Sequence, residues 1–169
     1  MVAQYLFFLL AIVAVVAALG MLLSRNPVTS ALWLILNLFC IAGLYLTLNA
    51  QFIAVIQVLV YAGAIMVLFL FVIMLLNLAA LPALQMVDVK RGFAFILAMG
   101  VLAELAYIVA RAVDALPAPV AVDAAVENGS AGTIAKVLFT QYAMPLELVG
   151  VLLLVATIGA VMFAKRRFA

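Results

Sequence analysis

The sequence predicts an all-α membrane protein that crosses the bilayer five times. Its 169 residues are 73% hydrophobic and only 8% charged, and a water-soluble domain of this length could not bury so much apolar surface. A helix needs about 20 apolar residues to cross a hydrocarbon core of roughly 30 Å. We therefore expect a single transmembrane domain over residues 1–169, with helices at about 2–23, 28–48, 52–77, 92–113 and 145–164.

The first two spans are separated only by a short break at Ser24–Pro27. We expect the first span to be retained, because no basic residue precedes it and its apolar run exceeds the roughly 7–15 residues of a signal-peptide core. Asn26 is a good N-cap and Pro27 suits the first helical position, so the second span should begin there. Asn37 lies near the middle of this span. Its amide makes either an interhelical hydrogen bond or part of a polar pathway.

The third span, Gln51–Asn77, is uncharged and overlong. The surplus length has to be absorbed by tilt, by a kink or by a change of helical pitch. Gln57 precedes Tyr61 by four positions, so both side chains are expected on one face, turned towards protein or water. Only Asn49-Ala50 separates the second and third spans, which should form a tight antiparallel hairpin.

The last two spans each carry a carboxylate. Glu104 lies close to mid-depth in the fourth span, where a charge costs at least about 2.5–3.5 kcal/mol, so it should be protonated, paired with Arg111 or a partner chain, or facing a wet cavity. Glu147 follows Pro145 by two residues, and either sits in the first helical turn or lines a polar path. Between these spans runs an outside loop, 114–142, in which Gly132-Thr133 should cap a short amphipathic segment on the membrane surface.

The basic residues predict the orientation. With the N-terminus outside and the C-terminus inside, six of the eight basic residues fall on the inner side, as the positive-inside rule requires. These six are Arg25, Lys90, Arg91, Lys165, Arg166 and Arg167.

Composition excludes several kinds of chemistry. The chain has no histidine and one cysteine, Cys40, which excludes an iron–sulfur cluster bound by this chain alone and argues against zinc or axial haem ligation. No nucleophile–base pair, phosphate loop or nucleotide fingerprint is present, and no nucleic-acid partner is expected. We therefore expect no catalytic residue, no metal ligand and no cofactor site. What remains is a sparse set of intramembrane polar groups: Asn37, Gln57, Tyr61, Glu104 and Glu147.

Two stretches of the chain carry a family resemblance that extends over almost its whole length. The segment IQVLVYAGAIMVLFLFVIMLL, Ile56–Leu76, resembles the third helix of subunit J of the proton-pumping NADH–quinone oxidoreductase, respiratory complex I. The segment from Gly132 to Arg167 is similar to the entry into that family's fifth helix. The mitochondrial counterpart of this subunit is chain 6.

The resemblance implies a subunit of the bacterial inner membrane that has no activity of its own. Flavin mononucleotide, iron–sulfur clusters and quinone would be held by partner subunits, and this chain would pack among the other membrane-arm subunits in the lipid bilayer. It would couple quinone reduction to proton translocation. The resemblance also implies a π-bulge around Tyr61–Gly63 in some states and a regular α-helix in others. Tyr61 and Gly63 would then serve a conformational switch, and Gln57, Glu104, Glu147 and Asn37 would be candidates for lining the proton path.

The sequence is also compatible with other functions. The chain could be the equivalent subunit of a multisubunit cation/proton antiporter or of a membrane-bound hydrogenase, and co-purifying flavin and iron–sulfur subunits would favour the oxidoreductase. It could also be a purely structural packing subunit, in which Tyr61 is a buried phenol bonded to a neighbouring helix. A self-sufficient transporter is disfavoured, because the chain shows neither an inverted repeat nor paired broken helices.

The orientation can be tested by labelling. Single cysteines placed near Val122 should react with an impermeant thiol reagent in intact cells, whereas those near Gln85 should not, because the basic residues cluster on the side of Gln85. The reverse pattern of labelling would overturn the orientation.

Overall fold

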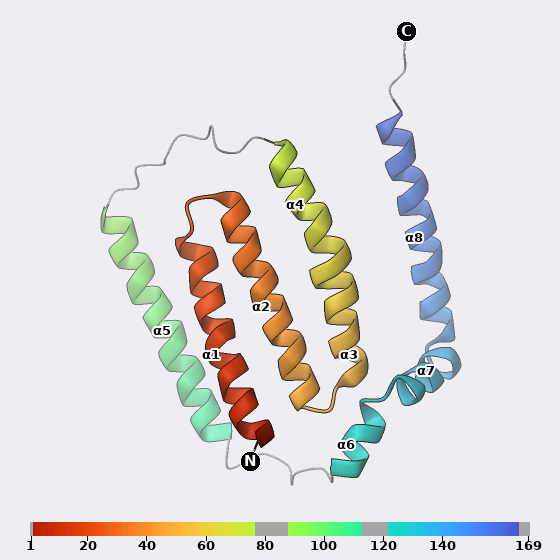
Figure 1. The fold of residues 1–169 in the computed structure, drawn as a ribbon, viewed down its shortest axis with the longest axis horizontal. Coiled ribbons are helices and arrows are strands. Elements are labelled where there is room, and N and C mark those ends of the chain that lie inside the picture. Colours follow the sequence, from red (N-terminus) through yellow and green to blue (C-terminus); the bar gives the residue numbers. More distant parts are fainter. Residues whose placement is uncertain (1, 77–87, 113–121, 166–169) are drawn as a thin grey trace.

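The computed structural model describes residues 2–76, 88–112 and 122–165, which are helical apart from short turns (Figure 1). The third span is continuous, but it changes from α to π winding and back again. Five helices are long and apolar enough to cross a membrane, so the predicted all-α, five-span class is confirmed. The elements are α1 (Val2–Leu23), α2 (Pro27–Thr47), α3 (Gln51–Ile56), the π-helix η1 (Gln57–Ile65), α4 (Met66–Leu75), α5 (Asp88–Ala112), α6 (Val122–Asn128), α7 (Ala131–Thr140) and α8 (Ala143–Ala164).

The start of α2 follows the predicted capping. The Oδ1 atom of Asn26 accepts a hydrogen bond of 2.9 Å from the backbone N–H of Val28, and Pro27 occupies the first helical position. The cap satisfies one of the first-turn N–H groups, which have no partner inside a helix.

The segment between the fourth and fifth spans contains the expected short helix, α7, but differs from the expectation in a further helix, α6, and in the residue that caps α7. Helices α6 and α7 lie within it, and the cap of α7 is Ser130 rather than Gly132-Thr133: Ser130 Oγ accepts from the Thr133 N–H at 3.3 Å. Serine is the better cap because its hydroxyl can reach the N–H three residues later. Helix α8 begins two residues before Pro145, since proline is tolerated throughout the first turn.

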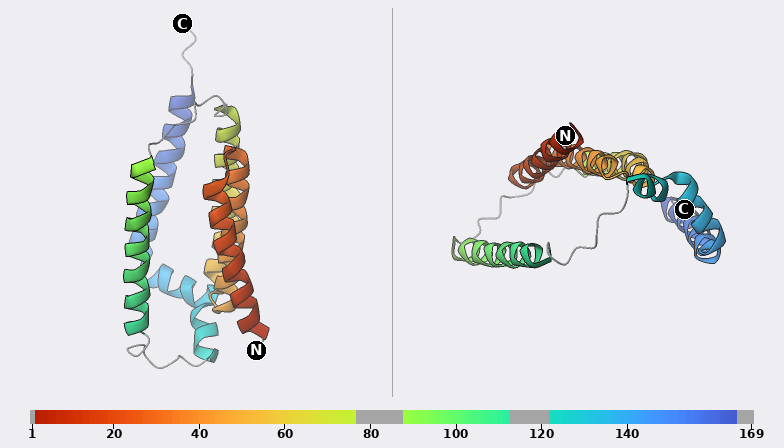
Figure 2. Two further views of the ribbon diagram at one scale, coloured as in Figure 1. Left: turned by 90° about the vertical axis from the view of Figure 1, so that its left-hand side faces the viewer. Right: turned by 90° about the horizontal axis from the view of Figure 1, so that it is seen from below.

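Helices α1, α2 and the third span form a packed layer (Figure 2). Small side chains dominate its buried positions, which are Ala17, Ala31, Cys40, Ala42, Ala54, Ala62, Met66 and the polar Gln57. A Cβ atom on Gly20 would lie 2.7 Å from the ring of Trp33, and one on Gly43 would lie 2.8 Å from Leu10 Cδ1. The helices therefore approach closely because small residues meet large ones, as is typical of packing in membranes.

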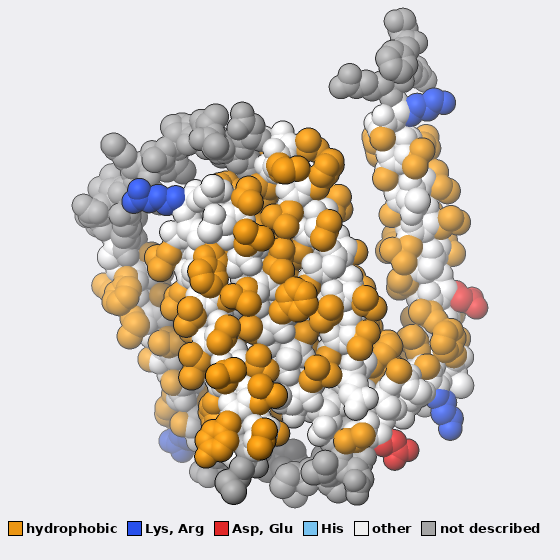
Figure 3. Space-filling view, viewed as in Figure 1, with side chains coloured by type: hydrophobic (Ala, Val, Ile, Leu, Met, Phe, Trp, Pro, Cys, Tyr) orange, Lys and Arg blue, Asp and Glu red, His pale blue; other side chains and the backbone are white. Residues whose placement is uncertain are grey.

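Helices α5 and α8 stand apart from this layer (Figure 2). Every residue of α5 whose side chain the structure describes is exposed, and α8 packs mainly on α7. The visible face of the molecule is apolar over α1 to α4, with charged side chains near its margins (Figure 3). In lipid such surfaces are compatible with bilayer or with helices of other chains.

The ends of the elements define two sides. The beginning of α1, the α2–α3 turn and α6–α7 lie at one end, whereas the α1–α2 break, the end of α4 and the end of α8 lie at the other (Figure 1). This alternation is what five spans require. Which end faces the cytoplasm remains the prediction made from the basic residues.

Candidate functional site

The winding of the third span changes between Gln57 and Ile65. Over these nine residues the helix is π-wound, with backbone hydrogen bonds that reach five residues back instead of four. At its end the Met66 N–H is directed to the carbonyl oxygens of Tyr61 and Gly63. The wide turn thus encloses the Tyr61–Gly63 positions singled out above. Such π-helical turns are frequent at functional sites.

The spacing of the buried residues along this span changes where the helix is π-wound. These residues are Ala54 at 3% exposed, Gln57 at 8%, Ala62 at 6% and Met66 at 5%, so the intervals are three, five and four residues. A regular α-helix returns to one face after three or four residues. The interval of five is therefore the point at which π winding shifts the buried face by one residue.

This shift separates Gln57 from Tyr61, contrary to the expectation that they share a face. Gln57 is buried against the helical layer, whereas the Tyr61 side chain is 50% exposed. The expectation assumed α periodicity, in which residues four apart lie above one another. With π winding, Ala62 takes the inward position that Tyr61 would have had.

Gln57 is the buried polar residue of the described chain. It lies at the first position of η1, which packs against α2. None of the side-chain hydrogen bonds among the described residues involves its amide. An amide in this position has hydrogen-bonding capacity to offer to water or to another chain.

Asn37 has a partner inside the layer. Its Nδ2 atom donates a hydrogen bond of 2.7 Å to the backbone carbonyl oxygen of Ala14, which joins α2 to α1. The residue is half-buried on the side of α2 that meets α1. This geometry is that of the interhelical hydrogen bond considered from the sequence.

Glu104 lies on α5, away from the packed layer, and its side chain is exposed. The guanidinium carbon of Arg111 lies 5.4 Å from the centre of the Tyr107 ring, in a cation–π contact on the same helix. Arg111 lies seven residues, or about two turns, beyond Glu104, and its contact is with Tyr107, which lies between them. Within a membrane the Glu104 carboxyl would depend on water or on groups from another chain.

Glu147 is the fifth residue of α8 and its side chain is exposed. The interpretation that it sits in the first helical turn is wrong, because α8 begins at Ala143 rather than at Pro145. The positive end of a helix dipole acts mainly within the first turn. The position of Glu147 therefore needs another explanation.

The structure does not gather the candidate residues into one site. Gln57, Asn37, Glu104 and Glu147 lie on η1, α2, α5 and α8. Among the described residues no group of three or more histidine, cysteine or acidic side chains could hold a metal ion. The arrangement offers separated polar positions within apolar helices, which can serve as steps for a proton only together with groups from elsewhere.

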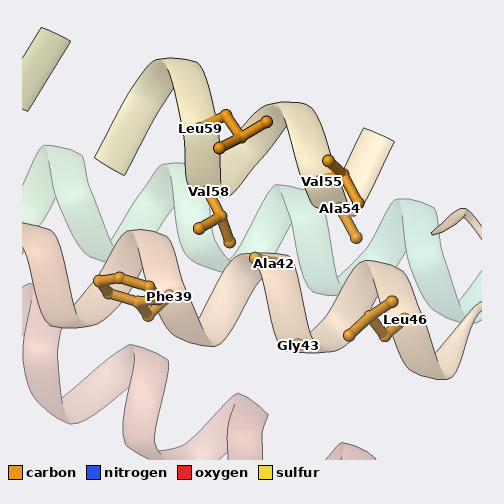
Figure 4. A pocket seen from close by; sticks show the side chains of 8 residues that line it. All are labelled: Phe39, Ala42, Gly43, Leu46, Ala54, Val55, Val58 and Leu59. Carbon is orange, nitrogen blue, oxygen red and sulfur yellow. The ribbon is translucent and has the colours of Figure 1, made fainter. Parts of the chain in front are cut away.

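An apolar groove runs along one side of η1. It has a volume of about 440 Å³ and lies between α2 and the third span (Figure 4). Val58 and Leu59 of η1 face Phe39 and Ala42 of α2 across it. One side of the π-helical stretch therefore borders open space, whereas Ala62 is buried.

Two contributors to this arrangement were missed from the sequence, Ala62 and Met66. The five-residue interval cannot be recognised there, because Ala62, Gly63 and Ala64 are all small and each could occupy a close helix contact. Only their exposure in the structure distinguishes these three residues: Ala62 is buried, Gly63 is half-buried and Ala64 is exposed.

Taken together, the fold and these positions define a multi-pass, all-helical membrane protein whose third span contains a π-helical turn. A family model for NADH-ubiquinone/plastoquinone oxidoreductase chain 6 matches residues 17–163. The chain belongs to this family.

Relatives from several bacteria match along nearly the whole chain. The NADH-quinone oxidoreductase subunit J of Rhodobacter capsulatus is 38% identical, over 96% of this chain and 81% of the relative. The NAD(P)H-quinone oxidoreductase chain 6 of Leptolyngbya boryana is 39% identical, over 96% and 79%. Subunit J of Rickettsia bellii is 30% identical, over 95% and 80%.

The hydrogen bond of Asn37 predicts a structural role. Replacing Asn37 by leucine keeps the size of the side chain but removes the bond to Ala14, so we expect a stability loss of roughly 0.6 kcal/mol. Quinone-linked turnover by membranes that contain the variant should be unchanged, because the bond only joins α1 to α2. Thermal unfolding and proton pumping would be measured beside a Thr157→Val control, which removes a hydroxyl bond within α8. Lost pumping in a stable Asn37→Leu protein would place Asn37 in the proton path instead.

Proposed function

We propose that this chain is a membrane-arm subunit of a proton-pumping NADH–quinone oxidoreductase in a bacterial inner membrane, with its N-terminus outside and its C-terminus inside. The names of its relatives describe subunits or chains of NADH- and NAD(P)H-quinone oxidoreductases. It contributes no catalytic residue, and partner subunits hold flavin mononucleotide, iron–sulfur clusters and quinone. The absence of histidine and the single cysteine in the sequence support this division of labour.

The observation that carries the proposal is the π winding of Gln57–Ile65. We propose that this stretch alternates between π and α winding and so couples quinone reduction to proton translocation. A change from π to α winding would rotate the part of the span that follows by about 100°, which is the rotation per residue in an α-helix. Tyr61 and Ile65, each now 50% exposed, would then replace Ala62 and Met66 on the face that meets α2.

The packing around η1 supports such a rotation. A helix that is closely packed all round resists turning, because packed interiors have little free volume. The groove beside Val58 and Leu59 leaves space on one side of η1, and the inward Ala62 is small. Both windings have to lie within a few kcal/mol for each to be populated.

The rotation would change which side chain of the third span faces α2, and so whether that position offers a hydrogen-bonding group. In the π form an alanine faces α2 where the α form would present the Tyr61 hydroxyl, close in sequence to Gln57. A hydroxyl can both donate and accept a hydrogen bond, whereas a methyl group can do neither. Glu104 and Glu147 would be lining groups that connect this position to hydrated regions formed with partner subunits.

The carboxylates can be tested by replacement with glutamine. Each change keeps the shape of the side chain but removes the titratable proton, so Glu104→Gln or Glu147→Gln should lower proton pumping while the complex still assembles. The larger loss is expected at Glu104, which lies deeper in its span. Glu127→Gln, in α6 outside the spans, is the control. Normal pumping by both variants would make these groups structural in this chain.

The winding change can be tested at Gly63. A Cβ atom there would lie 3.1 Å from the Val58 carbonyl oxygen, five residues earlier, so a branched side chain should disfavour the π turn. In Gly63→Val, quinone-linked turnover and pumping should fall, about tenfold for each 1.4 kcal/mol by which the balance moves. NADH oxidation by artificial acceptors should survive, because that chemistry lies on other chains.

The control for Gly63→Val is Ala64→Val, which adds bulk at the neighbouring exposed position. A static helix predicts a different result: Gly63→Val would reduce assembly, and whatever complex assembled would pump normally. Structures of the complex in two catalytic states provide the direct test, and one unchanged hydrogen-bond pattern from Val60 to Met66 in both would refute the switch.

A further inference from the structure

The start of the third span is held by a turn from a distant part of the chain. The backbone N–H of Phe52, in α3, donates a hydrogen bond of 3.2 Å to the carbonyl oxygen of Gly129. Gly129 lies in the Asn128–Ser130 turn, which joins α6 to α7. Helix α7 also packs on α3, so the contact is part of an interface between two segments.

This bond supplies a cap that the local sequence lacks. Phe52 is in the first turn of α3, whose N–H groups have no acceptor inside the helix. The N-cap position is Ala50, and no side chain makes a capping hydrogen bond there. The Gly129 carbonyl therefore satisfies a donor that would otherwise need water at the membrane boundary.

Position 129 has to be glycine for the turn to approach so closely. A Cβ atom on Gly129 would overlap the carbonyl oxygen of Asn49, and would lie 2.9 Å from the Asn49 carbonyl carbon and 3.2 Å from Ala50 Cα. These are backbone atoms, which cannot move aside as the end of a side chain can. Asn49 itself has a φ of 61°, in the left-handed region that asparagine and glycine tolerate best.

We propose that the Asn128–Ser130 turn is a clip that anchors the start of the third span and that coupling depends on it. With α3 fixed, a change of winding in η1 has to displace the following half, α4. The clip also joins η1 to α8, because α8 packs on α7 and α7 on α3. The consequence for winding rests on the switch proposed above, whereas the anchoring contact does not.

Hydrogen exchange in the intact complex tests the anchor. In Gly129→Ala, peptides that contain Phe52 should exchange roughly two- to tenfold faster than in the wild type, the change expected for loss of one backbone hydrogen bond. The matched control is Gly132→Ala in α7, where no atom lies within 4 Å of the added Cβ. Its Phe52 peptides should exchange as in the wild type. Unchanged exchange in assembled Gly129→Ala would overturn the clip.

A second pair of variants changes Asn49, which lies on the other side of the same contact, in the turn between α2 and α3. This pair tests the proposal if Gly129→Ala does not assemble. Alanine is unsuited to the left-handed conformation at position 49, so Asn49→Ala should shift the turn between α2 and α3. The backbone amide of Phe52 should then exchange its hydrogen faster. Asn49→Gly tolerates this conformation and should leave the exchange unchanged. Equal exchange in both Asn49 variants would contradict the proposed contact.

Quinone-linked turnover tests the functional half of the proposal. Variants that expose Phe52 to exchange should also turn over more slowly than Gly132→Ala and Asn49→Gly, while NADH oxidation by artificial acceptors stays the same in all of them. Faster exchange with normal turnover would show that coupling does not depend on the clip. That outcome would leave the winding change at Gly63 standing, since the Gly63 variants test it separately.

Discussion

The structure depends on one constraint: inside hydrocarbon, each backbone N–H and C=O group has to find its partner within the protein. The α and π windings both meet this requirement, with acceptors four or five residues back. A span can therefore exchange one winding for the other at far lower cost than it could unwind. The third span uses π winding over Gln57–Ile65, where a soluble protein could equally have used a loop. A conformational change that keeps the backbone satisfied is the kind of change that a membrane allows.

Close helix packing follows from the same environment. Lipid is as apolar as leucine, so helices in a bilayer are held by van der Waals contact and by scattered hydrogen bonds rather than by the hydrophobic effect. Here Gly20 lies against Trp33, Gly43 against Leu10, and Asn37 binds the backbone of Ala14. These contacts fix α1 to α2. The side of η1 at Val58 and Leu59 borders the apolar groove instead, so closely packed and open parts of the layer lie next to each other.

The separation of α5 and α8 from this layer has a physical consequence for their carboxylates. Glu104 and Glu147 sit on helices whose described side chains are mainly exposed, and a charged group in lipid is costly. Within a membrane these carboxyl groups would depend on water or on groups from other chains, which agrees with membership in a family named for one chain of an oxidoreductase. The polar path we propose is therefore a property of an assembly, in which this chain supplies some steps and the means of changing one of them.

The sequence by itself determined the five spans, because length and apolar composition decide what can cross a bilayer. It also determined the start of α2, since Asn26 and Pro27 act within one turn of the chain. It did not predict the inward face of the third span: α periodicity placed Tyr61 there, whereas Ala62 is buried in the π-wound helix, and the neighbouring small residues hide this difference in the sequence. The capping of α7 by Ser130 and the second-turn position of Glu147 depend on where helices begin, which several nearby residues could set. The partner of Asn37 and the contact of Gly129 with the α2–α3 turn could come only from the tertiary structure, because each joins segments whose proximity no local pattern records.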